Sequence, residues 1–378
     1  MAAELYIIAQ VEFFATAVHQ RTDTMATRLL TYPAWGYQHE SGDWRVHISG
    51  VSWISPVEFN RRQKMLIRVV GNKMQATDEE LASDIFRERV SPFLAEGDHK
   101  RLVCVNVGGR EFVLRRRTRR NGHFRNWITV PRRLIETTSV AHPEQAGRML
   151  PFSIWVEGES ETRLETQARL LPPHGISVVS DIDDTIKHSG VEDKSTLLRN
   201  TFLNDYKGVS QMASLYQQWS DMGACFHYVS SSPWPLYGPL MDMKRDHLLP
   251  FGTMHLRNFR IRDELLKKFI IRRQGKRLAI RKLMKCYPTR DFVLIGDSGE
   301  KDPEIYLKVT RRGKGRIKGL FIRDLPHNPM DVEIYAKIRK ALAGSPLIRF
   351  RDGEDLKQKA GGLISELTGE AKGSRSLV

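Results

Sequence analysis

An apolar run that ends in a cluster of carboxylates limits the folds open to this chain more than any other feature. Residues 178–186 read VVSDIDDTI. A strand buried on both faces of a parallel sheet has such a continuous apolar pattern, and ligands in open α/β sheets lie beyond the carboxyl ends of the strands. Because side chains alternate along an extended chain, Asp181 and Asp183 face the same crevice. The run therefore predicts an α/β fold with a functional site at this strand end.

Two aspartates at one strand end repel each other unless a cation or a shared proton offsets their charge. This arrangement favours phosphoryl transfer with an aspartate nucleophile. Short acidic runs at strand ends also form turns and cap helices, however, and residues 178–186 alone do not decide between the two interpretations.

A second apolar run, at residues 292–295, ends in acid in the same way. It leads into the segment GDSGEKDPEIY, whose two glycines permit sharp turns. Asp297 and Asp302 then lie in a loop, where a hard cation would find oxygen ligands. Asp302 also fits a helix cap, with Pro303 in the first turn. Capping does not explain Asp297, which follows the strand directly.

Two further elements fit the same plan. Residues 225–229 (CFHYV) predict a strand that ends at Ser230, whose hydroxyl can donate to a phosphoryl oxygen or cap the next helix. Lys276 precedes a predicted helix at 278–284, which leads into the strand at 292–295. A lysine at a helix start is unfavourable for the helix dipole, which hints at another role, although such a lysine is more often a solvated surface charge.

The order of these four motifs resembles that of the haloacid dehalogenase (HAD) superfamily of Mg²⁺-dependent phosphatases. The segments SDIDDTI, HYVSSSPWPLY and GDSGEKDPEIY are similar to the corresponding motifs of phosphatidate phosphatases related to the fungal actin-patch enzyme. The resemblance covers most of residues 174–325. Lipins are similar in the first motif but carry glycine where this chain has Asp184. The resemblance implies a HAD-like Rossmannoid parallel sheet with helices on both faces.

The resemblance also implies roles for the acidic residues. Asp181 would be the nucleophile that forms an aspartyl-phosphate, and Asp183 would be the general acid and then the general base. These roles need opposite protonation states, so we expect a raised pKa for Asp183 and an ionised Asp181. Asp181, Asp297 and the main-chain carbonyl of Asp183 would hold Mg²⁺, which suits an all-oxygen ligand set.

The remaining motif residues would act on the phosphate or support the site. By the same resemblance, Ser230 would donate to a phosphoryl oxygen and Lys276 would neutralise charge in the transition state. Asp302 would orient the metal shell or Lys276. Thr185 would be a supporting residue of the first motif.

The 378 residues are enough for two domains. Alternating patterns at 44–53, 101–107, 111–115, 124–130 and 152–157, with one helix announced by a capping box at 77–80, predict a β-rich, sandwich-like N-terminal domain over residues 1–171. The proline-containing segment 171–175 is the expected junction to a catalytic domain at 172–343. Residues 344–378 are rich in Gly, Lys and Glu, and we expect a frayed C-terminal tail.

Three widely spaced cysteines fit neither a disulfide framework nor a metal cluster, so they are expected to be core residues in a reducing compartment. Residues 1–18 resemble neither a signal peptide nor a membrane span, and no other segment qualifies as one. We therefore expect a cytoplasmic protein that is soluble or peripheral at membranes.

The net charge of +16 and pI of 9.8 indicate an anionic partner. Basic residues cluster at 115–120, 257–290 and 308–318. These runs are either solvated faces or contacts with acidic lipid, and no RRM, zinc-finger or helix-turn-helix signature supports nucleic acid. The expected partner is an anionic phospholipid surface that contains phosphatidate. Cytoskeletal or endocytic protein partners are implied by the resemblance alone.

Two segments near the motifs bear on the substrate. Residues 186–208 predict a small flap rather than a large cap domain, which suits a substrate presented at a membrane. Within that flap, His188 is expected at the surface, although it could contact a headgroup. The aromatic segment 234–237 is expected in the core more than in the headgroup zone.

The leading hypothesis is a Mg²⁺-dependent phosphatidate phosphatase that releases diacylglycerol and phosphate. A phosphatase for a phosphoprotein, soluble metabolite or nucleotide is the nearest alternative. A non-catalytic adaptor for anionic lipid and a nucleic-acid-binding module are the others.

Overall fold

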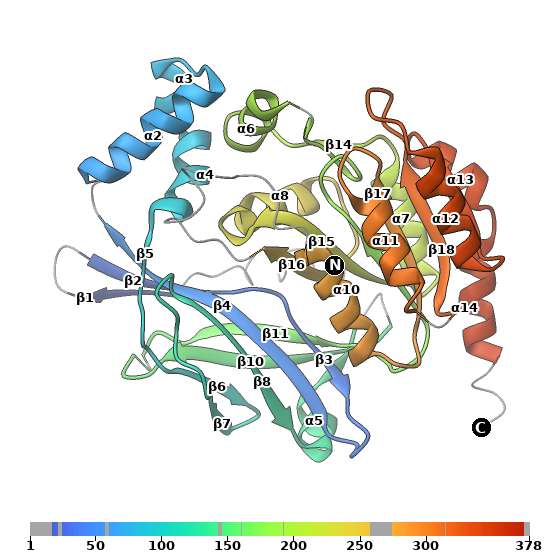
Figure 1. The fold of residues 1–378 in the computed structure, drawn as a ribbon. Helices are drawn as coiled ribbons and strands as arrows, with labels where there is room; N and C mark the ends of the chain where they lie inside the picture. Colours follow the sequence, from blue (N-terminus) through green and yellow to red (C-terminus); the bar gives the residue numbers. More distant parts are fainter. Residues whose placement is uncertain are drawn as a thin grey trace, which may run out of the picture. The chain divides into compact units, whose positions relative to one another are not determined.

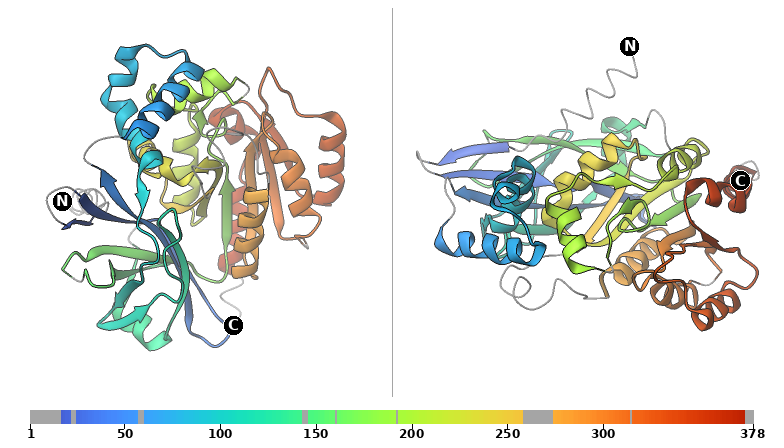
Figure 2. Two further views of the ribbon diagram at one scale, coloured as in Figure 1. Left: turned by 60° about the vertical axis from the view of Figure 1, so that its left-hand side comes forward. Right: turned by 90° about the horizontal axis from the view of Figure 1, so that it is seen from above.

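The computed structural model describes residues 17–21, 25–56, 60–142, 146–159, 161–191, 193–257, 274–313 and 315–373. These residues form two compact units (Figures 1 and 2). The first lies within 1–61, 94–143 and 147–172, and the second within 62–93, 144–146 and 173–378.

The first unit is β-rich, as predicted. Its elements are β1 (Ala17–Arg21), β2 (Met25–Thr31), β3 (Ala34–Gln38), β4 (Trp44–Pro56), β5 (Glu96–Gly97), β6 (Val103–Val107), β7 (Arg110–Val113), β8 (His123–Val130), α5 (Arg132–Thr138), β9 (Val140–Ala141), β10 (Arg148–Val156) and β11 (Leu164–Leu170). Among the described residues, pairing joins these strands into one sheet of order β1-β2-β4-β3-β11-β10-β6-β7, with β5 and β8 on β4 and β9 on β10. A sandwich would have two separate sheets, so the described residues do not form the sandwich-like arrangement that the sequence predicted.

The long strand β4 organises this sheet. It pairs with β2 and β3 along one edge and with β5 and β8 along the other. Inward-facing side chains such as Val46 and Ile48 join Val105, Phe152 and others in one hydrophobic cluster. Gly50 is required in β4, because a Cβ there would lie 2.2 Å from the carbonyl oxygen of Leu30. The core thus lies within the folded-over sheet.

Three helices lie between β4 and β5, where the sequence predicted one. They are α2 (Arg61–Met74), α3 (Asp78–Ala82) and α4 (Asp84–Leu94). The predicted capping box is confirmed, with Thr77 and Glu80 each accepting the other's backbone N–H. Ser83 then takes an extended conformation, and its hydroxyl accepts from the N–H of Phe86, so α3 ends and α4 begins. Residues 62–93 belong to the second unit, and the domain expected at 1–171 is therefore not continuous.

The second unit is an α/β structure. Besides α2–α4 it contains β12 (Ile176–Ser180), β13 (Lys187–His188), α6 (Lys194–Phe202), β14 (Lys207–Gly208), α7 (Met212–Asp221), β15 (Cys225–Pro233), η1 (Trp234–Leu236), α8 (Tyr237–Asp246), β16 (Gly252–Arg257), α10 (Gln274–Cys286), β17 (Asp291–Asp297), α11 (Asp302–Thr310), β18 (Ile317–Arg323), α12 (Val332–Leu342), β19 (Leu347–Phe350), α13 (Gly353–Ala360) and α14 (Leu363–Gly373).

A parallel sheet of order β16-β15-β12-β17-β18-β19 forms the centre of this unit. Every residue of β12 is buried, so both faces of the sheet are covered there. Ser180, the last residue of β12, pairs with Tyr228 of β15 and Ile295 of β17. The carboxyl ends of three neighbouring strands therefore meet at one edge, which confirms the α/β prediction.

The expectation of a frayed tail after about residue 340 is wrong for the described residues. Strand β19 pairs in parallel with β18 and extends the central sheet. Phe350, Leu356 and Ile364 are buried. Apolar residues spaced along one helical face anchor α13 and α14, although the overall composition there is charged and glycine-rich.

Candidate active site

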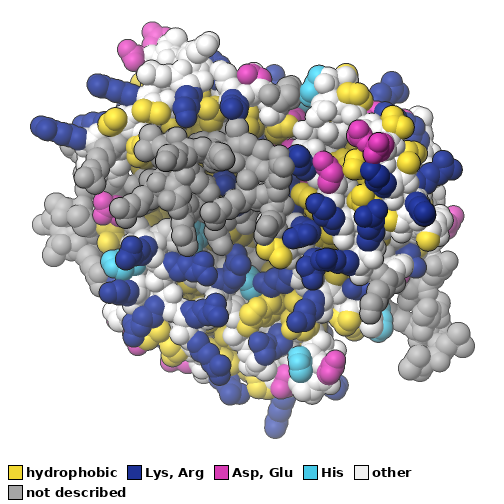
Figure 3. Space-filling view, viewed as in Figure 1, with side chains coloured by type: hydrophobic (Ala, Val, Ile, Leu, Met, Phe, Trp, Pro, Cys, Tyr) yellow, Lys and Arg dark blue, Asp and Glu magenta, His cyan; other side chains and the backbone are white. Residues whose placement is uncertain are grey.

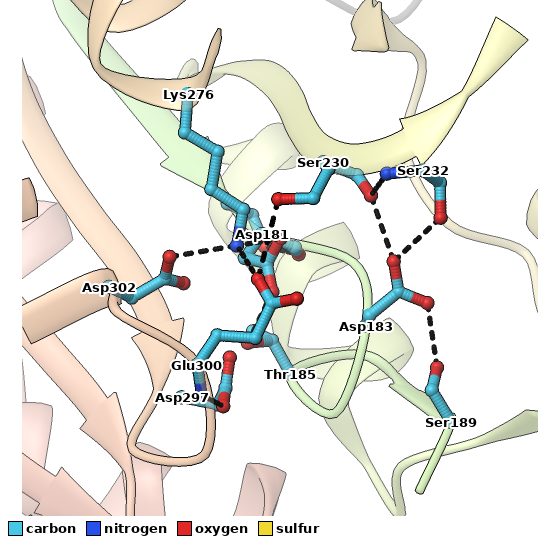
Figure 4. A network of polar contacts seen from close by, with 12 residues as sticks. Asp181, Asp183, Thr185, Ser189, Ser230, Ser232, Lys276, Asp297, Glu300 and Asp302 are labelled. Atoms are coloured by element: carbon cyan, nitrogen blue, oxygen red, sulfur yellow. Dashed lines mark hydrogen bonds and ion pairs between the residues drawn. The ribbon is translucent and has the colours of Figure 1, made fainter. Parts of the chain in front are cut away.

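The four sequence motifs converge at the carboxyl end of the central sheet (Figure 4). Asp181 follows β12, Ser230 lies in the last part of β15, Asp297 ends β17, and Lys276 lies in the first turn of α10. The exposed fraction of each of these side chains is at most 4%. Residues far apart in the sequence thus form one buried polar cluster.

Lys276 holds three carboxylates together. Its ammonium nitrogen lies 2.8 Å from oxygens of Asp181, Asp302 and Glu300. Burial opposes charge on Lys276, but the surrounding carboxylates hold its pKa well above the ordinary value. Lys276 is therefore a cation of the site and not a solvated surface lysine.

Asp302 can lie beside Lys276 because residue 296 is a glycine, which leaves room for the Asp302 side chain. A Cβ on Gly296 would lie 2.3 Å from Oδ2 of Asp302 and 2.8 Å from the hydroxyl of Tyr306. Tyr306 donates to the carbonyl oxygen of Ile295 at 2.8 Å and lies 3.4 Å from the same Asp302 oxygen. Asp302 is thus fixed beside Lys276.

The acidic cluster fits a divalent cation. Oxygens of Asp181, Asp297 and Asp302 lie within 4.8 Å of one another. Asp297 accepts the backbone N–H groups of Gly299 and Glu300 through Oδ1, whereas its buried Oδ2 has no hydrogen-bond partner among the described residues. An unpaired buried carboxylate oxygen beside two further carboxylates is what an oxygen-seeking cation requires.

The pKa values show the same deficit of positive charge. Burial and the neighbouring carboxylates raise the pKa of Asp181 well above its ordinary value, despite the ammonium of Lys276. Burial and Asp302 raise the pKa of Asp297 to about 8. One lysine is therefore too little charge for this cluster, and Mg²⁺ would suit its all-oxygen donors.

Asp183 lies apart from the carboxylates around Lys276 and is surrounded by donors (Figure 4). Its Oδ1 accepts from Ser189 at 2.7 Å and pairs with Lys187 at 3.1 Å, and its Oδ2 accepts from Ser230 and Ser232, each at 2.8 Å. The Asp183 side chain is not part of the carboxylate trio. Ser230, expected to bind a phosphoryl oxygen, here donates to Asp183.

The expectation of a raised pKa for Asp183 is wrong in this structure. Burial alone would raise it, but the ammonium of Lys187 and the hydrogen bonds from Ser189 and Ser232 hold the pKa of Asp183 well below its ordinary value. The expectation of an ionised Asp181 was tied to a bound Mg²⁺, whose charge would lower the raised pKa described above. Burial and the neighbouring charges set the pKa values of Asp183 and Asp181, and the motif alone does not predict them.

Asp184 organises the loop that follows Asp181. It has a left-handed backbone, with φ of 52°. Its carboxylate accepts the N–H groups of Ser189 and Gly190 through Oδ1, at 2.7 and 3.1 Å, and that of Val191 through Oδ2, at 3.0 Å. Asp184 is therefore a structural residue that sets the start of the flap.

The other sequence-predicted residues have clear places. Thr185 lies 3.4 Å from Oδ2 of Asp181, in a supporting position. The aromatic segment 234–237 belongs to the core, since Trp234, Leu236 and Tyr237 are buried. His188 is exposed, as expected. No disulfide joins the three cysteines, all of which are described and buried.

Sequence reasoning missed several residues of the site. Lys187, Ser189, Ser232 and Glu300 all contact the motif residues. Ser232 lies two positions after Ser230 on the same strand, and this spacing could have found it. Lys187 and Ser189 lie in a flap whose path depends on Asp184, so no local pattern announces them.

Comparisons with known proteins support the motif assignment. Residues 176–324 match the family model described as the catalytic domain of phosphatidate phosphatase APP1. Phosphatidate phosphatase APP1 of Saccharomyces cerevisiae is 30% identical over 183 residues, which cover 47% of this chain and 31% of that protein. An uncharacterized protein of Schizosaccharomyces pombe is 32% identical over 169 residues, which cover 42% of this chain and 27% of that protein.

The family model therefore matches residues of the second unit, and the matches to the two curated relatives span less than a third of each relative's length. A crystal structure of an uncharacterized protein from Listeria monocytogenes serotype 4b has a TM-score of 0.33 and 13% identity, covering 50% of this chain and 99% of that one. A similarity at that level bears on neither fold nor function. The resemblance to phosphatidate phosphatases of the actin-patch type is confirmed over residues 176–324.

Within the described residues, no helix has both the length and the apolar character needed to cross a bilayer.

Proposed function

We propose that this chain is a Mg²⁺-dependent phosphatidate phosphatase that hydrolyses phosphatidate to diacylglycerol and inorganic phosphate. The observation that carries the proposal is Asp181, a buried carboxylate at a strand end, which contacts Lys276 and is followed two residues later by the buried Asp183. The family match over the same residues supports it. The parallel sheet with its site at the strand ends supports a HAD-like fold.

The proposed first step transfers the phosphoryl group to the enzyme. An oxygen of Asp181 forms a bond to phosphorus while the bond between phosphorus and the glycerol oxygen breaks. Asp183 takes up a proton from solvent as the substrate binds and gives it to that leaving oxygen, and Lys276 offsets charge on the phosphoryl oxygens. When the phosphate enters, the hydroxyl of Ser230 turns to it from Asp183, which removes one donor that favours the charged form of Asp183.

The proposed second step releases phosphate. Asp183, now a carboxylate, takes a proton from a water molecule whose oxygen attacks phosphorus, and the bond to Asp181 breaks. The low pKa of Asp183 suits this step, because the base must be deprotonated. Ser189 and Lys187 hold its other oxygen while this happens.

A divalent cation would be held by Asp181 and Asp297, together with the main-chain carbonyl of Asp183. When bound it would supply positive charge that keeps Asp181 ionised and offsets the phosphate charge. Asp302 is close enough to the other carboxylates to share in this site, and its ion pair with Lys276 also supports the orienting role.

A membrane substrate accords with the charge of the chain. The net charge is +16, and Lys and Arg side chains are spread over the face seen in Figure 3. In the first unit, five arginines between β7 and β8 are exposed: Arg115, Arg116, Arg117, Arg119 and Arg120. Each basic residue near an acidic lipid surface contributes roughly 1 kcal/mol to binding. An anionic phospholipid surface is therefore the proposed partner, with the protein peripheral to it.

Phosphate release from phosphatidate vesicles tests the proposal against its rivals. We expect Mg²⁺-dependent release that EDTA abolishes. Turnover of p-nitrophenyl phosphate or a phosphopeptide without turnover of phosphatidate would assign another phosphoester. Binding to anionic vesicles without any phosphate release would assign a lipid adaptor.

A further inference from the structure

We propose that Tyr206 and Arg89 are positioning residues for Asp183 and act through Lys187, so that helix α4 takes part in catalysis. The inference rests on the proposed function, in which Asp183 is the general acid. It adds α4 (Asp84–Leu94), which lies far before the first motif in the sequence, to the residues that serve the site.

The first link joins Lys187 to Asp183. Lys187 is 3% exposed, and its ammonium lies 3.1 Å from Oδ1 of Asp183. The same oxygen accepts from Ser189, so Oδ1 is held by two donors while Oδ2 faces Ser230 and Ser232. The place of the Lys187 ammonium therefore sets the rotation of the Asp183 carboxyl group.

The second link joins Lys187 to an aromatic ring. The Lys187 ammonium lies 4.4 Å from the ring centroid of Tyr206, and the guanidinium carbon of Arg89 lies 4.3 Å from the same centroid. Cations over an aromatic face are attracted by the electron density of the ring, more strongly where water is excluded. Lys187 thus has two fixed neighbours, Asp183 and the Tyr206 ring.

Hydrogen bonds hold Arg89 and Tyr206 in place. Arg89 is 9% exposed and donates to the carbonyl oxygen of Thr201 at 3.2 Å and to that of Asn204. The hydroxyl of Tyr206 donates to the same carbonyl oxygen of Thr201, also at 3.2 Å. Arg89 therefore clamps the end of α6 and the residues after it, from which Tyr206 projects.

Helix α4 packs firmly against the flap. Phe86 and Phe93 of α4 contact Phe202 of α6 edge to face, with ring centroids 6.3 and 5.4 Å apart. Arg199 of α6 pairs with Glu80 of α3. Figures 1 and 2 show α4 beside α6 in both views. The small flap expected at 186–208 is thus extended by helices from elsewhere in the sequence.

Positioning of a general acid has a distinctive kinetic effect. An alkoxide leaving group needs a proton in the transition state, whereas p-nitrophenolate leaves well without one. Misplacing Asp183 should therefore slow phosphoryl transfer from an alkyl ester far more than from p-nitrophenyl phosphate. A displacement of about 1 Å in a catalytic group can cost on the order of 100-fold in rate.

The experiment compares kcat/KM for dioctanoyl phosphatidate and p-nitrophenyl phosphate, because kcat/KM reports only the steps up to the first irreversible transfer. Tyr206→Leu removes the ring, and we expect a loss of at least ~10-fold on the phosphatidate against less than ~3-fold on p-nitrophenyl phosphate. Tyr206→Phe keeps the ring face and should stay within about 2-fold of wild type on both. Arg89→Met should show the same selective loss as Tyr206→Leu, in smaller degree.

Glu80→Gln is the matched control. It weakens the pair between Glu80 of α3 and Arg199 of α6 without touching the ring, and the ratio of the two substrates should not change. An equal loss on both substrates in Tyr206→Leu, or no rescue by Tyr206→Phe, would reduce Tyr206 to a structural residue. If Tyr206→Leu fails to fold, Arg89→Met decides by the same ratio.

Failure of the proposed function gives a different result. If the wild-type enzyme does not hydrolyse phosphatidate but cleaves glycerol 3-phosphate and p-nitrophenyl phosphate, it has another substrate. The ratio of kcat/KM for glycerol 3-phosphate to that for p-nitrophenyl phosphate then tests the role of Tyr206. A wild-type protein inactive on all three esters overturns both proposals.

Discussion

Replacing Asp184 with glycine, the residue that lipins carry there, should destabilise the catalytic unit by about 2–3 kcal/mol. The carboxylate of Asp184 accepts three backbone N–H groups, from Ser189, Gly190 and Val191, and is 5% exposed. A hydrogen bond to a charged group contributes about 1.5–3 kcal/mol to stability. Three such bonds to one carboxylate are not independent, so we take their joint contribution as roughly 4 kcal/mol. Glycine recovers about 1–2 kcal/mol, because φ of 52° is strained for a residue with a Cβ.

Two further variants separate these contributions. Asp184→Asn can keep the two bonds made by Oδ1 but sets its amide against the N–H of Val191, so it should cost about 1–2 kcal/mol. Asp184→Ala loses all three bonds and keeps the backbone strain, so it should cost most, about 4 kcal/mol. The predicted order of destabilisation is Asn, then Gly, then Ala.

Urea unfolding followed by circular dichroism measures these differences. The comparison is valid if the m-value stays constant across the variants. A glycine variant within about 0.5 kcal/mol of wild type, or one less stable than the alanine variant, would refute the argument. The first result would mean that the hydrogen bonds contribute little, and the second that the backbone is not strained.

Three other predictions concern the nucleophile, the buried lysine and an acid-sensitive histidine. Asp181→Asn should abolish phosphate release while the circular dichroism spectrum stays native, and turnover by this variant would remove Asp181 from its role. Lys276→Met should lower the unfolding free energy by about 3–5 kcal/mol, because it leaves buried carboxylates unpaired, whereas the exposed Lys285→Met on the same helix should change it by less than ~0.5 kcal/mol. Equal effects in both lysine variants would contradict the cluster. Burial and two neighbouring arginines lower the pKa of His123 to about 4, so the unfolded chain binds more protons than the folded chain between pH 6.5 and 4. The unfolding free energy should therefore fall as the pH is lowered from 6.5 to 4, by up to roughly 3 kcal/mol. His123→Asn should remove this part of the dependence of the unfolding free energy on pH, and an unchanged dependence in that variant would contradict the prediction.

The sequence was sufficient for the parts of the site that follow strands. Asp181 and Asp297 were predicted at strand ends because an apolar run stops at each acid, and parallel strands bring their carboxyl ends together. Lys276 was recognised by the resemblance, although its own surroundings in the sequence favour a surface residue. Its burial follows from the partners that the fold brings to it.

The contacts of the flap could not be predicted in the same way. Lys187 gains its role from the aromatic ring of Tyr206 and from a helix in the first hundred residues, and no short-range pattern records such a contact. The pKa of Asp183 was predicted with the wrong sign, because the four donors around it come from two separate segments, residues 187–189 and 230–232. Helix α2 and strand β19 were missed, since charged residues interrupt their apolar positions.

Phosphate release from phosphatidate vesicles, measured with Mg²⁺ and with EDTA for the wild type and Asp181→Asn, tests the central claim most directly. The account predicts release by the wild type only when Mg²⁺ is present, and none by Asp181→Asn in either condition. Release that persists in EDTA, or in the Asp181→Asn variant, would contradict it.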